Sequence, residues 1–112
     1  MGNYTKTAFV SSDSRSVGVL DLIHSDLCGP MSVVSLRGFE YYGAFIDDHS
    51  RKTWIYFLKS KKSEDVLQRF QEFKALVENQ TERKIRALRS DNGGEYTSKE
   101  FDGYCIQEGI RR

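Results

Sequence analysis

Apolar residues recur at short spacing in the first part of this chain and at helical spacing later, which predicts strands followed by helices. The mostly apolar run 19–26 predicts a first strand buried on both faces. Segments 39–47 and 53–58 are rich in aromatic and β-branched residues and flank the polar turn 48–52, which predicts an antiparallel hairpin. We therefore expect three strands in a meander.

A helical period begins after the third predicted strand. Ser63 is placed to cap this helix, and Glu64 and Asp65 put negative charge in its first turn, where the helix dipole favours it. The helix is expected to end near Asn79. Its predicted buried stripe consists of Val66, Leu67, Phe70, Phe73, Leu76 and Val77.

Two further elements and the opening of another follow. The short segment 85–90 predicts a fourth strand. Thr97 and Glu100 have the spacing of a capping box, which predicts a second helix, and Gly109 suits the left-handed position after that helix. Segment 110–112 predicts the start of a fifth strand. The expected buried residues of the second helix are Phe101, Tyr104 and Cys105.

This order predicts an α/β protein with a mixed sheet: a three-strand meander, a helix, a strand, a helix and the start of a fifth strand. Residues 1–18 are rich in Ser, Thr and Lys and lack an apolar period, so we expect a flexible leader or connector there. The folded domain is predicted to span 19–112, and a chain of 112 residues fits one domain.

Composition excludes several classes of protein. The 38% hydrophobic and 29% charged residues fit a soluble globular chain, and no apolar run approaches the length of a membrane span, about 18 residues. The two cysteines form no disulfide framework, which favours a reducing intracellular compartment, the nucleus or the cytoplasm. With a net charge of +1, a nucleic acid would have to be bound by local basic clusters. Clusters lie at 59–62, 83–89 and 111–112, and a solvated surface of mixed sign explains them as well.

Two aspartates stand where a metal-dependent nucleic-acid enzyme needs them. Asp26 closes the first apolar run and Asp91 closes the fourth. If those strands lie side by side, two carboxylates share one end of the sheet, and a divalent cation would relieve their repulsion. Gly93 and Gly94 would let a nucleic-acid backbone approach closely. From the residues alone, a simple turn at 91–94 remains an open alternative.

Other chemistry-bearing residues have structural explanations. Asp47 and Asp48 open the polar turn of the hairpin, and the strand–helix alternation of a phospho-acceptor receiver domain is absent. His24 and Cys28 supply two ligands, which do not make a zinc site. The aromatic residues of the third strand are expected to pack in the core rather than stack on bases: Trp54, Tyr56 and Phe57.

Four segments, in order, resemble the integrase catalytic core of copia-type LTR retrotransposons. They are 24–30 (HSDLCGP), 45–51 (FIDDHSR), 54–59 (WIYFLK) and 89–96 (RSDNGGEY). Four motifs in sequence are far more specific than any one of them, and the resemblance runs through 20–112, which is nearly all of the predicted domain.

The resemblance implies a ribonuclease H-like fold and an Asp, Asp, Glu triad that binds two divalent metals, Mg²⁺ or Mn²⁺. It also implies DNA as the partner, because enzymes of this family trim the ends of their element and join them to target DNA. Asp26 falls on the first family carboxylate and Asp91 on the second. The third, a glutamate on a later helix, falls past Arg112. Glu95 cannot replace it, because it follows Asp91 in the same loop.

We therefore expect a fragment of a Gag-Pol polyprotein with an incomplete integrase core. The isolated chain is expected to be inactive, because losing one member of a catalytic unit removes most of the rate. It is also expected to be marginally stable, because a sheet edge is left unpaired. A homo-oligomer is compatible with the resemblance, and no small-molecule cofactor is expected. The alternatives are a non-catalytic nucleic-acid-binding module and an element remnant without function.

Overall fold

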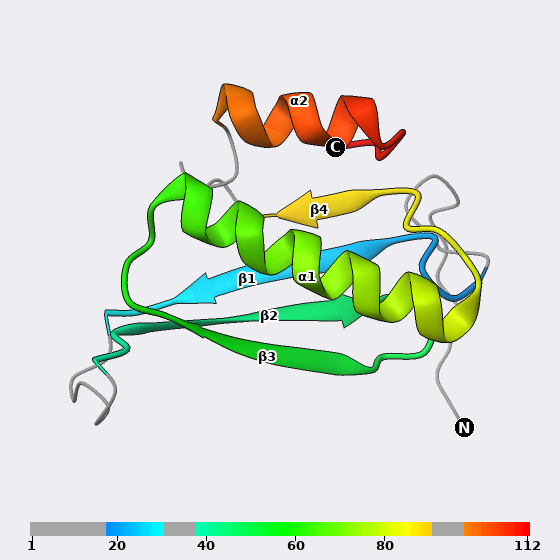
Figure 1. The fold of residues 1–112 in the computed structure, drawn as a ribbon. Helices are drawn as coiled ribbons and strands as arrows, with labels where there is room; N and C mark the ends of the chain where they lie inside the picture. Colours follow the sequence, from blue (N-terminus) through cyan, green and yellow to red (C-terminus); the bar gives the residue numbers. More distant parts are fainter. Residues whose placement is uncertain (1–17, 31–37, 91–97) are drawn as a thin grey trace.

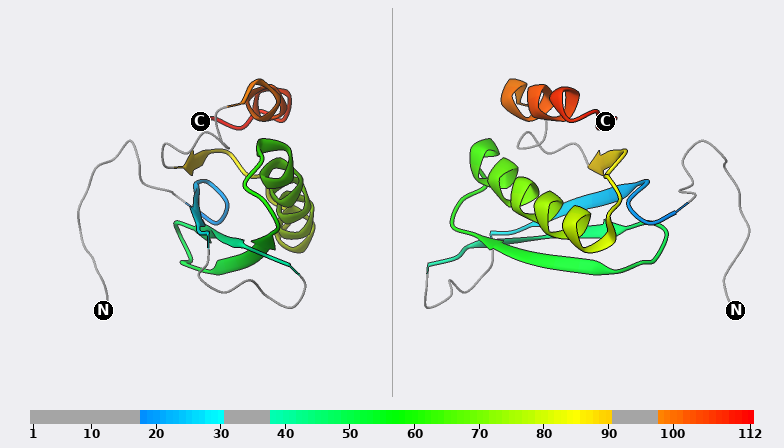
Figure 2. Two further views of the ribbon diagram at one scale, coloured as in Figure 1. Left: turned by 90° about the vertical axis from the view of Figure 1, so that its left-hand side faces the viewer. Right: turned by 45° about the vertical axis from the view of Figure 1, so that its right-hand side comes forward.

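One face of a four-stranded sheet carries the hydrophobic core. The computed structural model describes residues 18–30, 38–90 and 98–112 (Figure 1). In this part of the chain, helix α1 (Ser63–Thr81) crosses the sheet, and helix α2 (Lys99–Gln107) lies beside it at one edge (Figures 1 and 2). The predicted α/β class with a mixed sheet is confirmed.

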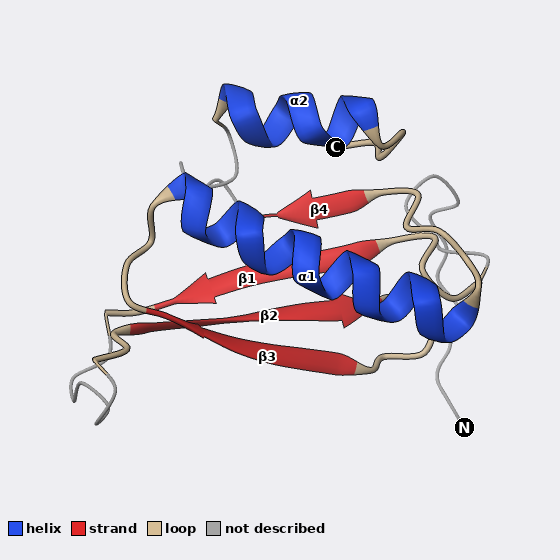
Figure 3. Ribbon diagram, in the orientation of Figure 1, coloured by secondary structure: helices blue, strands red, loops and turns tan. Residues whose placement is uncertain are grey.

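The sheet has the strand order β3-β2-β1-β4. Strands β1 (Ile23–Cys28), β2 (Tyr41–Asp47) and β3 (Thr53–Leu58) form the predicted antiparallel meander, and β3 has the predicted bounds. Strand β4 (Leu88–Ser90) pairs in parallel with β1, as Figure 3 shows, and is shorter than the predicted 85–90. Beyond β4, Arg111 forms a parallel bridge with Ala87, which is the predicted opening of a fifth strand.

The first strand begins later than predicted. Segment 19–22 is not strand, because Leu20 has a left-handed backbone (φ 70°) and Asp21 N–H donates to the Gly18 carbonyl in a turn. The strand also runs past Asp26 to Cys28. Its residues alternate between buried and more exposed positions, so the expectation of burial on both faces is wrong. Only the face toward α1 is covered by helices of the described residues.

The cap residues differ from the prediction. Lys62 is the N-cap of α1 but makes no capping hydrogen bond with its side chain, and Ser63 lies inside the helix with its hydroxyl bonded to Ser98. Ser98 caps α2 by accepting the Phe101 N–H at 3.1 Å, because its side chain stands three positions before that donor. The predicted cap, Thr97, lies outside the described residues. After α2, Gly109 has the expected left-handed backbone (φ 73°).

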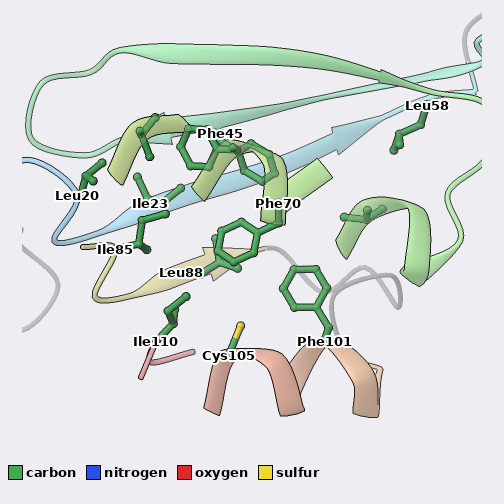
Figure 4. Close-up of a cluster of buried hydrophobic side chains, with 13 residues drawn as sticks. Leu20, Ile23, Phe45, Leu58, Phe70, Ile85, Leu88, Phe101, Cys105 and Ile110 are labelled. Carbon is green, nitrogen blue, oxygen red and sulfur yellow. The ribbon is translucent and has the colours of Figure 1, made fainter. Parts of the chain in front are cut away.

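Aromatic rings fill the space between the sheet and the helices (Figure 4). The Phe45 ring stacks on Phe73 with centroids 4.5 Å apart, and the Phe70 ring stacks on Phe101 at 5.6 Å. Burying each such side chain contributes about 1.5–3 kcal/mol before the entropy of ordering is subtracted. Trp54 joins the cluster through an edge contact with Phe73, as expected for a core residue.

Two apolar side chains expected in the core are exposed instead. Leu76 of α1 is 47% exposed, and Phe57 of β3 is 48% exposed. Phe57 lies on the sheet face opposite α1, because its neighbours Tyr56 and Leu58 occupy the covered face. The apolar pattern of the sequence therefore does not show which face of a strand or helix is covered by another layer.

An ion cluster around the buried Lys74 side chain links the two helices. The Lys74 ammonium of α1 contacts the Glu78 carboxylate at 2.9 Å and the Glu108 carboxylate, at the end of α2, at 2.8 Å. The second Glu78 oxygen accepts the Ile85 N–H at 2.8 Å. This cluster joins α1, the segment that leads to β4, and the end of α2. No helix of the described residues combines the length and the apolar character that crossing a membrane requires.

Candidate metal centre

Asp26 lies on the sheet face that α1 does not cover. Along β1, Ile23 and Ser25 are buried toward the helix, whereas Asp26 is exposed on the other face. Within the described residues, its carboxylate forms no hydrogen bond or ion pair. The prediction that Asp26 ends the strand is wrong by two residues, since β1 continues to Cys28. A carboxylate in the middle of an open face is accessible to a hydrated cation.

The parallel pairing of β1 and β4 bears on the second predicted ligand. The register pairs Ile23 with Leu88 and ends with Ser25 opposite Ser90. The next residue in the sequence is an aspartate in both cases, Asp26 and Asp91. Because the pairing is parallel, β1 and β4 run toward the same end of the sheet (Figure 1). Asp91 itself lies outside the described residues, so a site shared by the two carboxylates stays a prediction.

Asp47 has the structural role expected of it. Its side chain is fully buried, with one carboxylate oxygen accepting the Leu20 N–H at 2.8 Å and the other accepting the Ser50 N–H at 2.8 Å. These two hydrogen bonds connect the segment before β1 to the turn after β2. An acid at the end of a strand can therefore serve stability alone.

Asp48 forms a second polar contact on the open face. Its carboxylate lies 2.8 Å from His24 Nε2 and 3.8 Å from an Arg51 guanidinium nitrogen. His24 shares the sheet face of Asp26 because the two are separated by one residue on β1. The imidazole is therefore directed to the hairpin turn, and the prediction of a structural role for Asp48 agrees with this pairing.

A tyrosine that the sequence analysis did not single out lies near Asp26. The register places Tyr42 of β2 opposite Cys28 and Ala44 opposite Asp26. Hydrogen bonding to the Cys28 side chain, negative charge there, burial and the Asp26 carboxylate together raise the pKa of Tyr42. The predicted meander anticipated the pairing of β1 with β2, but Tyr42 reaches this position through the β1–β2 register, which the apolar pattern leaves undefined.

One groove in the described part of the chain lies elsewhere. It has a volume of about 360 Å³ and follows the edge strand β3 and helix α1, where Trp54, Phe73 and Leu76 line it. Asp26 is not among its lining residues. Among the described residues, Asp26 therefore lies outside this groove, on the sheet face opposite α1.

The donor chemistry at Asp26 fits a hard divalent cation in part. Carboxylate oxygens are the ligands that magnesium prefers, and magnesium keeps several waters when it binds one or two carboxylates. Among residues 18–30, 38–90 and 98–112, no group of three or more His, Cys, Asp or Glu side chains could hold a metal. The described residues therefore contribute a single carboxylate ligand, Asp26, and any further ligands of a metal ion would have to come from residues outside the described part of the chain.

The fold and the four motifs define the class of protein. The model of the integrase core domain family matches residues 18–112, so the chain belongs to this family. This match covers the described sheet and both helices, and it confirms the family resemblance drawn from the motifs at 24–30, 45–51, 54–59 and 89–96.

Similar proteins of known sequence include polyproteins of plant transposons. The retrovirus-related Pol polyprotein from transposon TNT 1-94 of Nicotiana tabacum is 53% identical over 110 residues, which are 98% of this chain and 8% of the polyprotein. The Pol polyprotein from transposon RE2 of Arabidopsis thaliana is 38% identical over 105 residues, which are 94% of this chain and 7% of the polyprotein. The chain thus spans less than a tenth of these relatives and corresponds to a fragment of a retrotransposon Pol polyprotein.

Solved structures of retroviral integrases share the fold. The catalytic core domain of HTLV-2 integrase, in complex with magnesium and in a trimeric form, superposes with a TM-score of 0.69 at 18% identity, covering 87% of this chain and 60% of that one. A simian T-cell lymphotropic virus intasome in complex with PP2A regulatory subunit B56 gamma gives a TM-score of 0.72 at 18% identity, covering 87% and 32%. At this identity the likeness establishes the ribonuclease H-like fold.

Proposed function

We propose that this chain carries part of an integrase active site, in which Asp26 and Asp91 hold divalent cations that engage DNA phosphates. The observation that carries the proposal is the parallel β1–β4 register, which ends at Ser25 and Ser90, one position before each aspartate in the sequence. In the longer Pol protein the reaction is polynucleotidyl transfer, which comprises processing of the element's 3′ ends and strand transfer into target DNA.

Asp26 has the properties that such a ligand needs. It is exposed on an uncovered sheet face, and the described residues provide no cation that neutralises it. Mg²⁺ and Mn²⁺ are coordinated by carboxylate oxygens together with water and phosphate oxygens. If Asp26 and Asp91 hold two such ions, the ions would supply charge stabilisation for the attacking and the leaving oxygen of a phosphodiester displacement.

Basic side chains on neighbouring strands supply a local attraction for the DNA backbone. Arg89 of β4 is exposed and pairs in register with His24, so it projects from the face that carries Asp26. Arg111 is exposed at its bridge to Ala87. With a net charge of +1, the chain has no overall field that attracts a polyanion, so these local cations have the larger effect.

Calorimetric titration with Mn²⁺ tests the metal site directly. Asp26→Asn and Asp91→Asn are each expected to weaken Mn²⁺ affinity about tenfold or more, since even supporting residues around a metal change affinity by about that factor. Asp48→Asn is the matched control, because it removes a carboxylate from the same face near the opposite end of β1, and it should leave the affinity unchanged. If both test substitutions bind Mn²⁺ like the wild type, the shared site does not exist.

A non-catalytic nucleic-acid-binding module is the second candidate. It is favoured by the donor set of the described residues, which contains no group of three potential metal ligands. If this candidate is correct, DNA affinity should be the same in Mg²⁺ and in EDTA and should be unaffected by Asp26→Asn. If the function depends on the metal, DNA affinity should be higher in Mg²⁺ than in EDTA and should fall in Asp26→Asn.

A further inference from the structure

Arg89 of β4 points away from the two helices. The side chain before it, Leu88, is buried in the core under α1, and the hydroxyl after it, on Ser90, lies 3.4 Å from a guanidinium nitrogen of Arg112. Successive side chains of a strand project to opposite faces, so Arg89 projects to the face that the described helices leave uncovered. It is exposed there and pairs in register with His24 of β1.

Arg111 projects to the same face from the backbone beside β4. Its parallel bridge is with Ala87, two positions before Arg89. Ile110 before it belongs to the hydrophobic core, and the guanidinium of Arg112 after it lies over an aromatic ring of α2, 5.0 Å from the ring centroid. Arg111 therefore projects away from the helices, where it is exposed. Arg89 and Arg111 are diagonal neighbours with backbones about 7–8 Å apart, which is within the reach of long side chains.

These two arginines differ from the others in their ion pairs. Arg86, on the same segment as Arg89, lies 3.7 Å from the Asp21 carboxylate. Within the described residues, Arg89 and Arg111 form no ion pair, so their charges are available to an anion from outside the chain. The other arginines in this part of the chain each pair with a carboxylate: Arg51, Arg69, Arg83, Arg86 and Arg112.

The acids on the same face do not neutralise these two charges. The Asp48 carboxylate lies 2.8 Å from His24 and 3.8 Å from Arg51. Asp26 forms no ion pair within the described residues. A guanidinium presents its N–H donors in a planar fork that matches the oxygens of a phosphate. Two such groups side by side on an open face therefore fit a polyanion that carries a phosphate at regular intervals.

We propose that Arg89 and Arg111 form a phosphate-binding pair, in which each guanidinium contacts one phosphate of the DNA backbone and no metal ion is needed. The DNA then lies over the edge of the open sheet face, at β4 and the segment after α2. This inference rests on the proposed function for the identity of the partner, DNA, and it does not require a cation at Asp26.

The salt dependence of DNA binding in EDTA counts these contacts. Each phosphate that a protein neutralises contributes about 0.9 to the slope of log affinity against log salt. Fluorescence anisotropy of a labelled duplex with the 112-residue chain should therefore give a slope lower by about 0.9 in Arg89→Gln and in Arg111→Gln, and by about 1.8 in the double variant. At low salt each single substitution should weaken binding about fivefold, the upper end for an exposed ion pair.

Arg86→Gln is the matched control, because it removes the same charge from the same segment, where Asp21 already neutralises it. It should bind with the wild-type slope. Arg89→Lys and Arg111→Lys keep the charge and should also retain the slope, which separates the loss of a phosphate contact from damage to the fold. The inference is overturned by an equal loss of slope in Arg86→Gln or in the lysine variants, or by an unchanged slope in the double glutamine variant.

The Mn²⁺ titration separates this inference from the proposed metal site. If Asp26→Asn and Asp91→Asn leave Mn²⁺ affinity unchanged while the double glutamine variant loses its slope in EDTA, the metal site fails and the inference stands. If both aspartate substitutions weaken Mn²⁺ binding and the double glutamine variant keeps the wild-type slope, the proposed function stands and the inference fails. A wild-type chain that does not bind the duplex in EDTA at low salt would also overturn the inference.

Discussion

Replacing Asp47 with asparagine should cost a large part of the stability of this fold. The buried Asp47 carboxylate accepts one backbone N–H with each oxygen, from Leu20 and from Ser50. An asparagine side chain has one acceptor oxygen, so one of these N–H groups would face an NH₂ donor. A donor that loses a charged acceptor in a buried site costs about 2–3 kcal/mol, which corresponds to about 10–15 °C in Tm for a domain of this size.

Urea denaturation followed by far-UV circular dichroism measures this loss. The slope of the free energy with urea should stay unchanged, so that the shift in midpoint reports stability. Asp48→Asn is the control, because Asp48 has a partly exposed side chain and pairs with His24, and it should cost less than about 1 kcal/mol. An Asp47→Asn protein as stable as Asp48→Asn would refute the assignment of Asp47 as the tether between β1 and the hairpin turn.

Two further substitutions test packing and electrostatics. Gly43→Ala would place a methyl group against the Tyr56 ring, which is stacked on Phe45, so thermal denaturation should reveal a loss of about 1–3 kcal/mol; an unchanged Tm would mean that the ring moves freely. Hydrogen bonding and charge attraction to Lys74 lower the pKa of Glu108, so the stability from this pair is present above the ordinary glutamate value of 4.5 and is lost as pH falls through the lowered value. The urea midpoint of Glu108→Gln should therefore fall less steeply with acid than that of the wild type, and parallel profiles would contradict the pairing.

Local patterns predicted the hairpin better than the elements around it. The aromatic and β-branched residues of 53–58 and the polar turn before them predicted β3 with the bounds that the structure shows. The start of β1 was missed because Leu20 is held in a left-handed conformation next to Asp47, a contact between residues far apart in the sequence. The cap of α1 was displaced by one residue because Ser63 bonds across to Ser98 instead of to its own helix. Each miss involves a tertiary contact that competes with a local preference.

In the candidate site, too, local sequence patterns were informative, whereas contacts between strands could not be predicted from them. Asp26 was proposed as a metal ligand from the sequence and stays a prediction, whereas the pairing of its strand with β4, which the order of elements allowed, is observed. Tyr42 was not identified, because its proximity to Asp26 depends on the cross-strand register, which hydrophobic alternation fixes only to within a shift of two residues. Asp91 was identified in the same way as Asp26, and its position lies outside the described residues.

The two sides of the sheet should respond differently to protein engineering. In the described part of the chain both helices lie on one side, and on the other side Ile55 and Phe57 of β3 are about half exposed. Charged replacements at these two positions leave the aromatic cluster under α1 intact, so they offer a route to better solubility that does not compromise folding. The same replacements at Trp54 or Tyr56, one residue away, would disrupt the interior.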